Sequence, residues 1–246
     1  MSASRDLRLT VVSTLLSHAP AFTEILDAAH PLLWRRRGAG LVGYGITARL
    51  EFSGPTRVAD AAAEWQHIVS NAHIDDSVNL AGSGLSAFGS FAFADDSSAI
   101  SVIVIPELII GRRDGQAFVT TITHAGQTPR PAEIPRISPL GEKAAVAFRA
   151  GEQSEAGYRE SVREAVRRIQ QGQVSKVVLA RDLVGTIADG ADIRPMVIDL
   201  AQSYPDCWTY CVDGLIGSSP ETLVRVHDST MDARVLAGTA ARGTAA

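Results

Sequence analysis

A lysine stands near the centre of an apolar segment. Burying its amine costs free energy unless the amine is paired or takes part in chemistry. Residues 174–181 are Val-Ser-Lys-Val-Val-Leu-Ala-Arg, and this density of β-branched and aliphatic residues predicts a buried β-strand. Period-two alternation would place Lys176, Val178 and Ala180 on one face of that strand. Because a buried amine is costly unless it is paired or used, Lys176 is a candidate catalytic residue.

A glutamate follows a proline in the second segment of interest, Gly-Ser-Ser-Pro-Glu at residues 217–221. Pro220 favours an extended conformation at Ser219 and so helps to set the chain direction before the carboxylate. These residues are equally typical of a surface helix that begins at a Ser219 cap and carries Glu221 in its first turn. The five residues alone leave both interpretations open.

Small residues dominate the third segment, Leu-Ala-Gly-Thr-Ala-Ala-Arg-Gly at residues 236–243. Missing or short side chains at Gly238 and Thr239 would allow the backbone to approach a ligand closely. Without context the segment indicates only the end of a strand.

In order and approximate spacing, the helix that ends near Gly172 and these three segments resemble the chorismate-utilising enzymes. That family includes isochorismate synthase, salicylate synthase, anthranilate synthase component I and aminodeoxychorismate synthase component I. The resemblance is strong over about residues 150–246. It is looser upstream, where residues 34–45 are similar to isochorismate synthases.

The resemblance implies which nucleophile is added to the chorismate ring. Lys176 occupies the position of the lysine that activates water in the isochorismate and salicylate enzymes, and the ammonia-using relatives lack that lysine. Ala237 occupies the position of the nucleophilic lysine of aminodeoxychorismate synthases. Together the two positions imply that water is the nucleophile.

The remaining roles are also implied by the resemblance. Glu221 corresponds to the general acid that protonates the departing 4-hydroxyl, and it must hold a proton to do so. Ala237, Gly238 and Thr239 match the segment that lies against the substrate, while Arg242 either stabilises an anionic group or is exposed. Lys176 must be neutral to take a proton from water, which requires burial or a nearby cation, because a free amine titrates near ~10.4. The alternative is a solvent-exposed lysine at a strand start.

Composition narrows the class of protein. The 246 residues are 46% hydrophobic, with a formal charge of −4 and a pI near 5.9, which gives no electrostatic basis for binding nucleic acid. The N-terminus lacks the organisation of a secretory signal, and no apolar run approaches a membrane span, so we expect a cytoplasmic protein without membrane contact. The two cysteines, Cys207 and Cys211, are expected to be reduced and to lie in strands. The three arginines at residues 35–37 are expected to form a solvated turn.

Hydrophobic periodicity, together with the proline, glycine and serine residues that begin or end elements, predicts both helices and strands. Proline-rich residues 128–139 predict a surface connection. Ser154 is expected to cap a helix that Gly172 ends. Helices are predicted at 56–72, after Ser154 and at 194–204, and strands at 40–52, 86–94, 99–109, 116–123, 174–181, 208–212, 214–218, 222–227 and 232–237.

The expected fold is α+β, a layered α/β structure with a large, mixed, mainly antiparallel sheet flanked by helices. Residues 1–139 would form the β-rich N-terminal part and residues 140–246 the first part of the catalytic core. The chain ends seven residues after Thr239, which predicts a truncated fold with exposed apolar strands. The resemblance implies a Mg²⁺ cofactor whose ligands lie C-terminal to residue 246, so the fragment alone is expected to be inactive.

The leading functional hypothesis is therefore an isochorismate synthase, for menaquinone or siderophore biosynthesis. Salicylate synthase is the nearest alternative, because it shares the hydration step and then eliminates pyruvate. A non-catalytic, truncated chorismate-binding paralogue is the alternative from another functional class. Lys176 disfavours an amidotransferase partner, and we expect a monomer.

Overall fold

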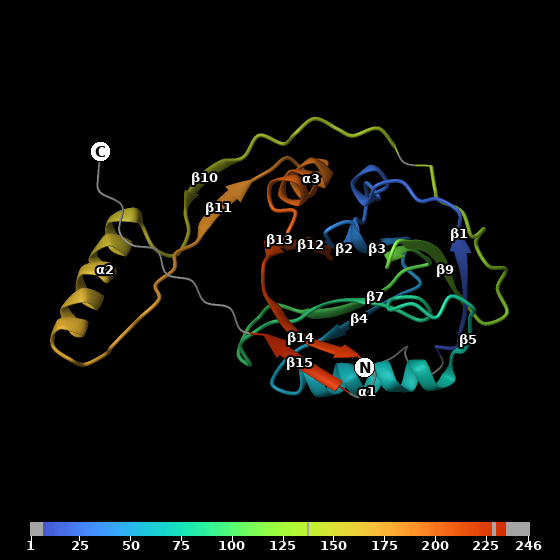
Figure 1. The fold of residues 1–246 in the computed structure, drawn as a ribbon. Coiled ribbons are helices and arrows are strands. Elements are labelled where there is room, and N and C mark those ends of the chain that lie inside the picture. Colours follow the sequence, from blue (N-terminus) through green and yellow to red (C-terminus); the bar gives the residue numbers. More distant parts are fainter. Residues whose placement is uncertain (1–6, 137, 228–229, 235–246) are drawn as a thin grey trace. The chain divides into compact units, whose positions relative to one another are not determined.

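Two compact units make up the chain in its computed structural model, which describes residues 7–136, 138–227 and 230–234 (Figure 1). One unit is Met1–Leu140 with Arg194–Ala246, and the other is Gly141–Ile193. The predicted division at residue 139 concerns the organisation of the whole family fold and stays a prediction.

An eight-stranded sheet is the main element of the first unit. Only β1 and β5 pair in parallel, and every other neighbouring pair in this sheet is antiparallel. This confirms the predicted mixed, mainly antiparallel sheet. In sheet order the strands are β13 (Leu215–Ser219), β12 (Trp208–Val212), β2 (Leu32–Arg36), β3 (Ala39–Tyr44), β8 (Leu108–Arg113), β9 (Gln116–His124), β1 (Leu9–Leu16) and β5 (His73–Asp76).

Tight two-residue turns set the register within this sheet. Asp213 and Gly214 have φ angles of 49° and 84°, and Asp114 and Gly115 have φ angles of 50° and 78°. Positive φ at both central residues is the type I′ geometry, whose twist matches that of the flanking strands, and Asp-Gly is a preferred sequence for it. The turn at residues 213–214 therefore fixes how β13 aligns with β12.

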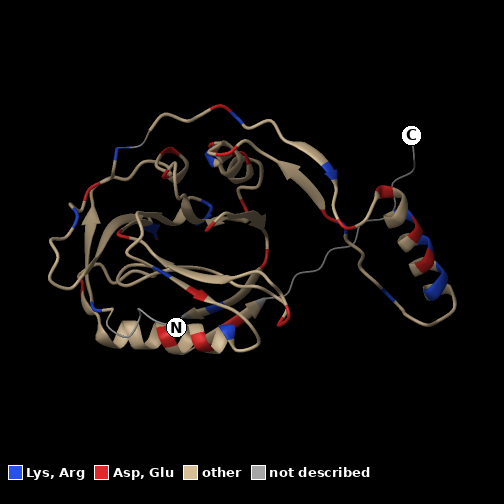
Figure 2. Cartoon of the chain, turned by 180° about the vertical axis from the view of Figure 1, so that it is seen from behind, with Lys and Arg blue, Asp and Glu red and all other residues tan. Residues whose placement is uncertain are grey.

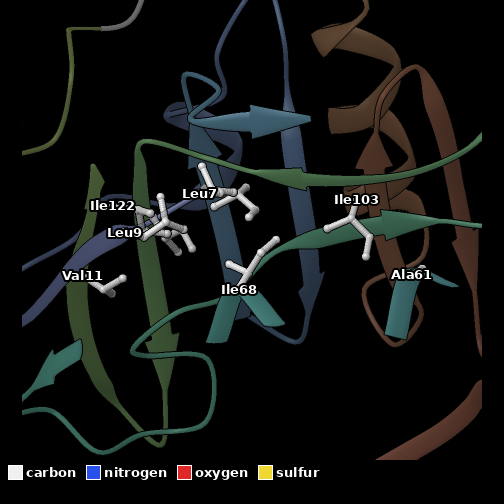
Figure 3. Close-up of a cluster of buried hydrophobic side chains, with 9 residues drawn as sticks. Leu7, Leu9, Val11, Ala61, Ile68, Ile103 and Ile122 are labelled. Atoms are coloured by element: carbon white, nitrogen blue, oxygen red, sulfur yellow. The ribbon is translucent and has the colours of Figure 1, made fainter. Parts of the chain in front are cut away.

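A smaller sheet packs between the large sheet and a helix. Its strands are β4 (Ala48–Phe52), β7 (Ser101–Ile105) and β6 (Phe88–Ser90), in that order. Alternation along β7 sends Val102 and Val104 into a cluster with residues of the large sheet, while Ile103 and Ile105 join the main core cluster. Both faces of β7 are thus apolar and buried. Figure 3 shows the main cluster, to which α1 contributes Ile68.

Helices cover the opposite sides of these sheets. The helix α1 (Arg57–Asn71) buries Ala61 and Ile68, and α3 (Arg194–Ser203) buries Val197 and Ala201 against the outer face, beside the short helix η1 (Phe22–Glu24). Both helices match the predicted ranges within one residue. No helix among the described residues has the length and apolar character that crossing a membrane requires.

The second unit contains a helix and a two-stranded sheet. Strands β10 (Ala147–Ala150) and β11 (Leu183–Thr186) pair antiparallel, and α2 spans Glu155–Gln170. The Ser154 hydroxyl accepts a hydrogen bond from the backbone N–H of Gly157 at 3.1 Å, which confirms the predicted cap.

Charged pairs stabilise the exposed side of α2, where acidic and basic residues alternate in Figure 2. Glu164 pairs with both Arg167 and Arg168, and their hydrogen bonds lower the pKa of Glu164 to about 2. None of residues 141–193, all of which are described, is buried. The unit therefore lacks a core of its own.

Several predicted elements differ from the structure. The expected strand 40–52 is two strands, β3 and β4, because the chain leaves the large sheet between them and enters the small one. The expected strand 99–109 is likewise β7 and the start of β8, and 86–94 shortens to β6. Five strands, β1, β2, β5, β10 and β11, had no predicted counterpart. Two of the three arginines at 35–37 belong to β2 rather than to a turn. Cys211 lies in β12, but Cys207 precedes it.

Candidate active site

Glu221 lies in the connection between β13 and β14 (Thr222–His227) and is exposed. Its backbone N–H donates to the Ser219 hydroxyl at 3.1 Å, which closes a tight local turn. No helix begins here, so the interpretation of Ser219 as a helix cap is wrong. β14 instead pairs with β15 (Thr230–Arg234) as a separate two-stranded sheet.

The hairpin of β12 and β13 positions this connection from the large sheet. Trp208 is the direct cross-strand partner of Ser219. The Trp208 indole N–H also donates to the Thr222 hydroxyl at 2.8 Å. The two residues that flank Pro220 and Glu221 are therefore both tied to Trp208, one through its strand and one through its side chain.

The tip of the same hairpin is held by a bidentate ion pair. Arg49 on β4 donates to the two carboxylate oxygens of Asp213 at 2.9 and 2.8 Å. These hydrogen bonds, helped by the charge of Arg49 and opposed by partial burial, lower the pKa of Asp213. The carboxylate consequently stays ionised, and the turn of the hairpin is fixed to the small sheet.

Lys176 lies in the second unit, and the predicted strand around it is wrong. Residues 174–181 form no strand, and Lys176 is exposed together with Val177 (44%) and Val178 (84%). The physical reason is that an isolated segment cannot make the ladder hydrogen bonds of a strand, and no described strand pairs with this one. Since Lys176 and Glu221 belong to different units, their pairing as base and acid stays a prediction.

The four other candidate residues, Ala237, Gly238, Thr239 and Arg242, lie outside the described residues. Among the described residues, no group of three or more His, Cys, Asp or Glu side chains could hold a metal ion. The expectation that the Mg²⁺ ligands lie C-terminal to residue 246 is not tested by this finding and stays a prediction.

A cavity of about 450 Å³ lies in the first unit, between η1 and α3. Its one cationic lining residue, Arg194, is only 2% exposed and donates to the backbone carbonyls of Ser138 and Pro139 at 3.0 and 2.8 Å. The guanidinium thus fastens the proline-rich connection onto α3. Glu221 does not line this cavity, so the cavity is not part of the candidate site.

Sequence reasoning missed Trp208 and Thr222, although a signal for them was present. The Asp-Gly pair at residues 213–214, between two apolar runs, is among the strongest short-range signals of a hairpin. Counting outward from that turn places Trp208 opposite Ser219, which is the observed register.

Three comparisons relate the chain to known proteins. A family model described as "Chorismate binding enzyme" matches residues 16–246. The salicylate biosynthesis isochorismate synthase of Pseudomonas aeruginosa is 26% identical over 237 residues, which cover 86% of this chain and 49% of that protein.

Two solved structures align with most of this chain. The menaquinone-specific isochorismate synthase MenF of Escherichia coli aligns with a TM-score of 0.59 and 18% identity, over 91% of this chain and 53% of that one. A putative 2,3-dihydroxybenzoate-specific isochorismate synthase of Bacillus anthracis aligns with a TM-score of 0.49, 15% identity and 48% coverage of its own chain. The likeness to the E. coli structure confirms the predicted α+β class. The chain spans about half the length of these proteins.

Proposed function

The chain belongs to the chorismate-binding enzyme family, and from this premise we propose that it takes part in the conversion of chorismate to isochorismate. In this reaction water adds at ring C2 while the 4-hydroxyl departs. The observation that carries the proposal is the family match over residues 16–246 in a chain with lysine at 176 and alanine at 237. That combination favours water over ammonia as the nucleophile.

Each of the two ionisable residues has one proton to move. Lys176, as a neutral amine, takes a proton from the attacking water, and Glu221, as a carboxylic acid, gives one to the departing hydroxyl. The position of Glu221 supports its role, because its carboxylate stands exposed at the end of an ordered strand and forms no ion pair or hydrogen bond within the described residues. A side chain so placed is accessible to a ligand.

The role of Lys176 requires a change in its surroundings. A neutral amine is favoured by desolvation, and Lys176 is exposed. We propose that residues 174–181 become a buried strand when further structure packs against the second unit, whose residues include none that is buried. Burial would then favour the neutral amine, because desolvation disfavours a charge. Without such packing, turnover by the chain is not expected.

Magnesium remains an expectation that follows from the family. The described residues offer no cluster of metal-binding side chains. No step of the proposed proton transfers is therefore assigned to a metal.

The function is tested by joining this chain to the part of the P. aeruginosa relative that it does not match. With chorismate and Mg²⁺, chromatography should detect isochorismate, and Lys176→Gln should lower the rate by about 10²–10⁴-fold, the usual contribution of a general base. Lys143→Gln is the matched control, since it removes the same charge from the same unit. An ammonia-dependent product, or a rate unchanged by Lys176→Gln, would refute the proposal.

A second candidate, a non-catalytic chorismate-binding chain, is favoured by the exposure of Lys176. Calorimetric titration of the chain with chorismate distinguishes the two functions. If the chain has the catalytic function, Glu221→Gln should change the binding of chorismate little and should abolish turnover in the joined protein. If the chain only binds chorismate, neither the chain nor the joined protein should show turnover. Release of pyruvate would instead indicate a salicylate synthase.

A further inference from the structure

An aromatic shelf lies beside the connection that carries Glu221. We define this shelf as Trp34, Trp208 and Tyr210, which lie on neighbouring strands β2 and β12. The ring of Trp34 is 5.5 Å from that of Trp208 and 5.7 Å from that of Tyr210, measured between centroids. The Arg36 guanidinium lies 5.6 Å from the Trp208 ring centroid. Contacts of these kinds restrict the orientation of the Trp208 indole.

Gly217 lets the shelf extend over the edge strand β13. Gly217 is the cross-strand partner of Tyr210, and a Cβ at this position would collide with the Tyr210 phenol ring. The strand that leads to Glu221 is therefore covered by an aromatic side chain that only a glycine permits.

The indole N–H is the one polar atom of the shelf that reaches the connection. It donates to the Thr222 hydroxyl at 2.8 Å across a sequence separation of 14 residues. Glu221 itself is held to Ser219 by a hydrogen bond that is local and exposed. The Trp208 bond is therefore the side-chain contact through which the large sheet fixes the residue directly after Glu221.

From this arrangement we propose that Trp208 is a positioning residue for Glu221, acting through the Thr222 hydroxyl. The inference rests on the acid role proposed for Glu221. If the indole bond is lost, the local Ser219 bond is the side-chain hydrogen bond that the connection keeps within the described residues, and Glu221 samples a wider range of positions. A misplacement of about 1 Å can cost about a hundredfold in rate, so a catalytic acid on a connection needs such an anchor.

Variants can separate a positioning role of Trp208 from a role in packing alone. Trp208 is only partly buried and belongs neither to the main core cluster nor to the cluster that contains Val102 and Val104. Trp208→Phe keeps an aromatic ring on the shelf and removes the N–H. Thr222→Val removes the acceptor at nearly constant volume, and Thr222→Ser restores it.

The test is the backbone mobility of Glu221 in the ¹⁵N-labelled chain, measured by NMR relaxation. We expect an order parameter of about 0.85 in the parent, a fall to below about 0.6 in Trp208→Phe and Thr222→Val, and recovery in Thr222→Ser. Tyr210→Phe is the control, because its hydroxyl makes no hydrogen bond with the described residues. The Trp208 indole proton should also exchange with solvent at least about tenfold faster in Thr222→Val than in Thr222→Ser.

Two results would overturn the inference. One is an unchanged order parameter at Glu221 in Trp208→Phe, and the other is a failure of Thr222→Ser to restore order lost in Thr222→Val. Both readouts are independent of turnover. An absence of isochorismate synthesis in the joined protein would therefore refute the proposed function while the NMR result still decides whether Trp208 positions Glu221.

Discussion

The loss of one buried guanidinium should destabilise the first unit by several kcal/mol. Arg57 begins α1 and is only 6% exposed. Its side chain donates to the carbonyl oxygens of Ala92 at 2.7 Å, Phe93 at 2.6 Å and Gly54 at 3.0 Å, and to the Asp95 carboxylate at 2.7 Å. It thus fastens the loop after β6 to the start of the helix.

The magnitude follows from these four bonds. A hydrogen bond from a charged donor is worth roughly 1.5–3 kcal/mol, but water replaces part of that at carbonyls near the surface, so we take about 1 kcal/mol for each of the three. The Asp95 carboxylate is 71% exposed, and an ion pair of that kind adds at most about 0.5 kcal/mol. Arg57→Met, which keeps the aliphatic stem, should therefore lower the free energy of unfolding by about 3 kcal/mol.

Urea unfolding followed by circular dichroism measures this change, with hydrogen exchange as a second readout. At about 2–4 °C per kcal/mol for a chain of this size, Tm should fall by roughly 6–12 °C, and the amides of residues 92–97 should exchange faster. Asp95→Asn is the matched control and should stay within about 0.5 kcal/mol of the parent. The reasoning is refuted if Arg57→Met is as stable as the parent, or if Asp95→Asn accounts for the whole loss.

Three further predictions concern other parts of the chain. Gly111→Ala should lower the free energy of unfolding by more than about 2 kcal/mol in urea, because the new Cβ would collide with the buried ring of Phe118, and Phe118→Leu should recover part of that loss. Burial raises the pKa of the Cys211 thiol to about 11, so a thiol reagent at pH 8 should label Cys207 first. Because the unfolded thiol ionises near ~8.5, stability should fall as pH rises from about 9 to 11, and Cys211→Val should remove that component. Limited proteolysis should cut within 141–193 first, since none of those residues is buried; initial cleavage in the first unit would contradict this.

Local patterns were sufficient to predict the helices and most of the antiparallel strands. The apolar repeat of α1 and the Ser154 cap of α2 are encoded within a few residues of each element, and both were found where the sequence placed them. β1 was missed because its pairing partner β9 lies more than 100 residues away, and because a buried pair of hydroxyls, Ser13 and Thr120, joins the two strands at 2.8 Å. A polar pair inside a sheet weakens the apolar signal by which strands are recognised.

In the candidate site, too, features set by neighbouring residues could be predicted, whereas features set by distant strands could not. The position of Glu221 after a short strand follows from its own neighbours, and the structure agrees. The strand around Lys176 was expected from composition alone, but composition reports only that Val177 and Val178 favour a strand, not that a neighbour is present to pair with them. The Trp208 contact could have been deduced only by carrying the hairpin register across to the connection.

The two borders of the eight-stranded sheet have a consequence for how the protein behaves at high concentration. β5, at one border, has four residues and carries Asp75 and Asp76; β13, at the other, has five and is followed by Pro220. Short strands, negative charge and proline are the means by which proteins discourage intermolecular strand addition. Fibre-like stacking through the borders of this sheet is therefore disfavoured.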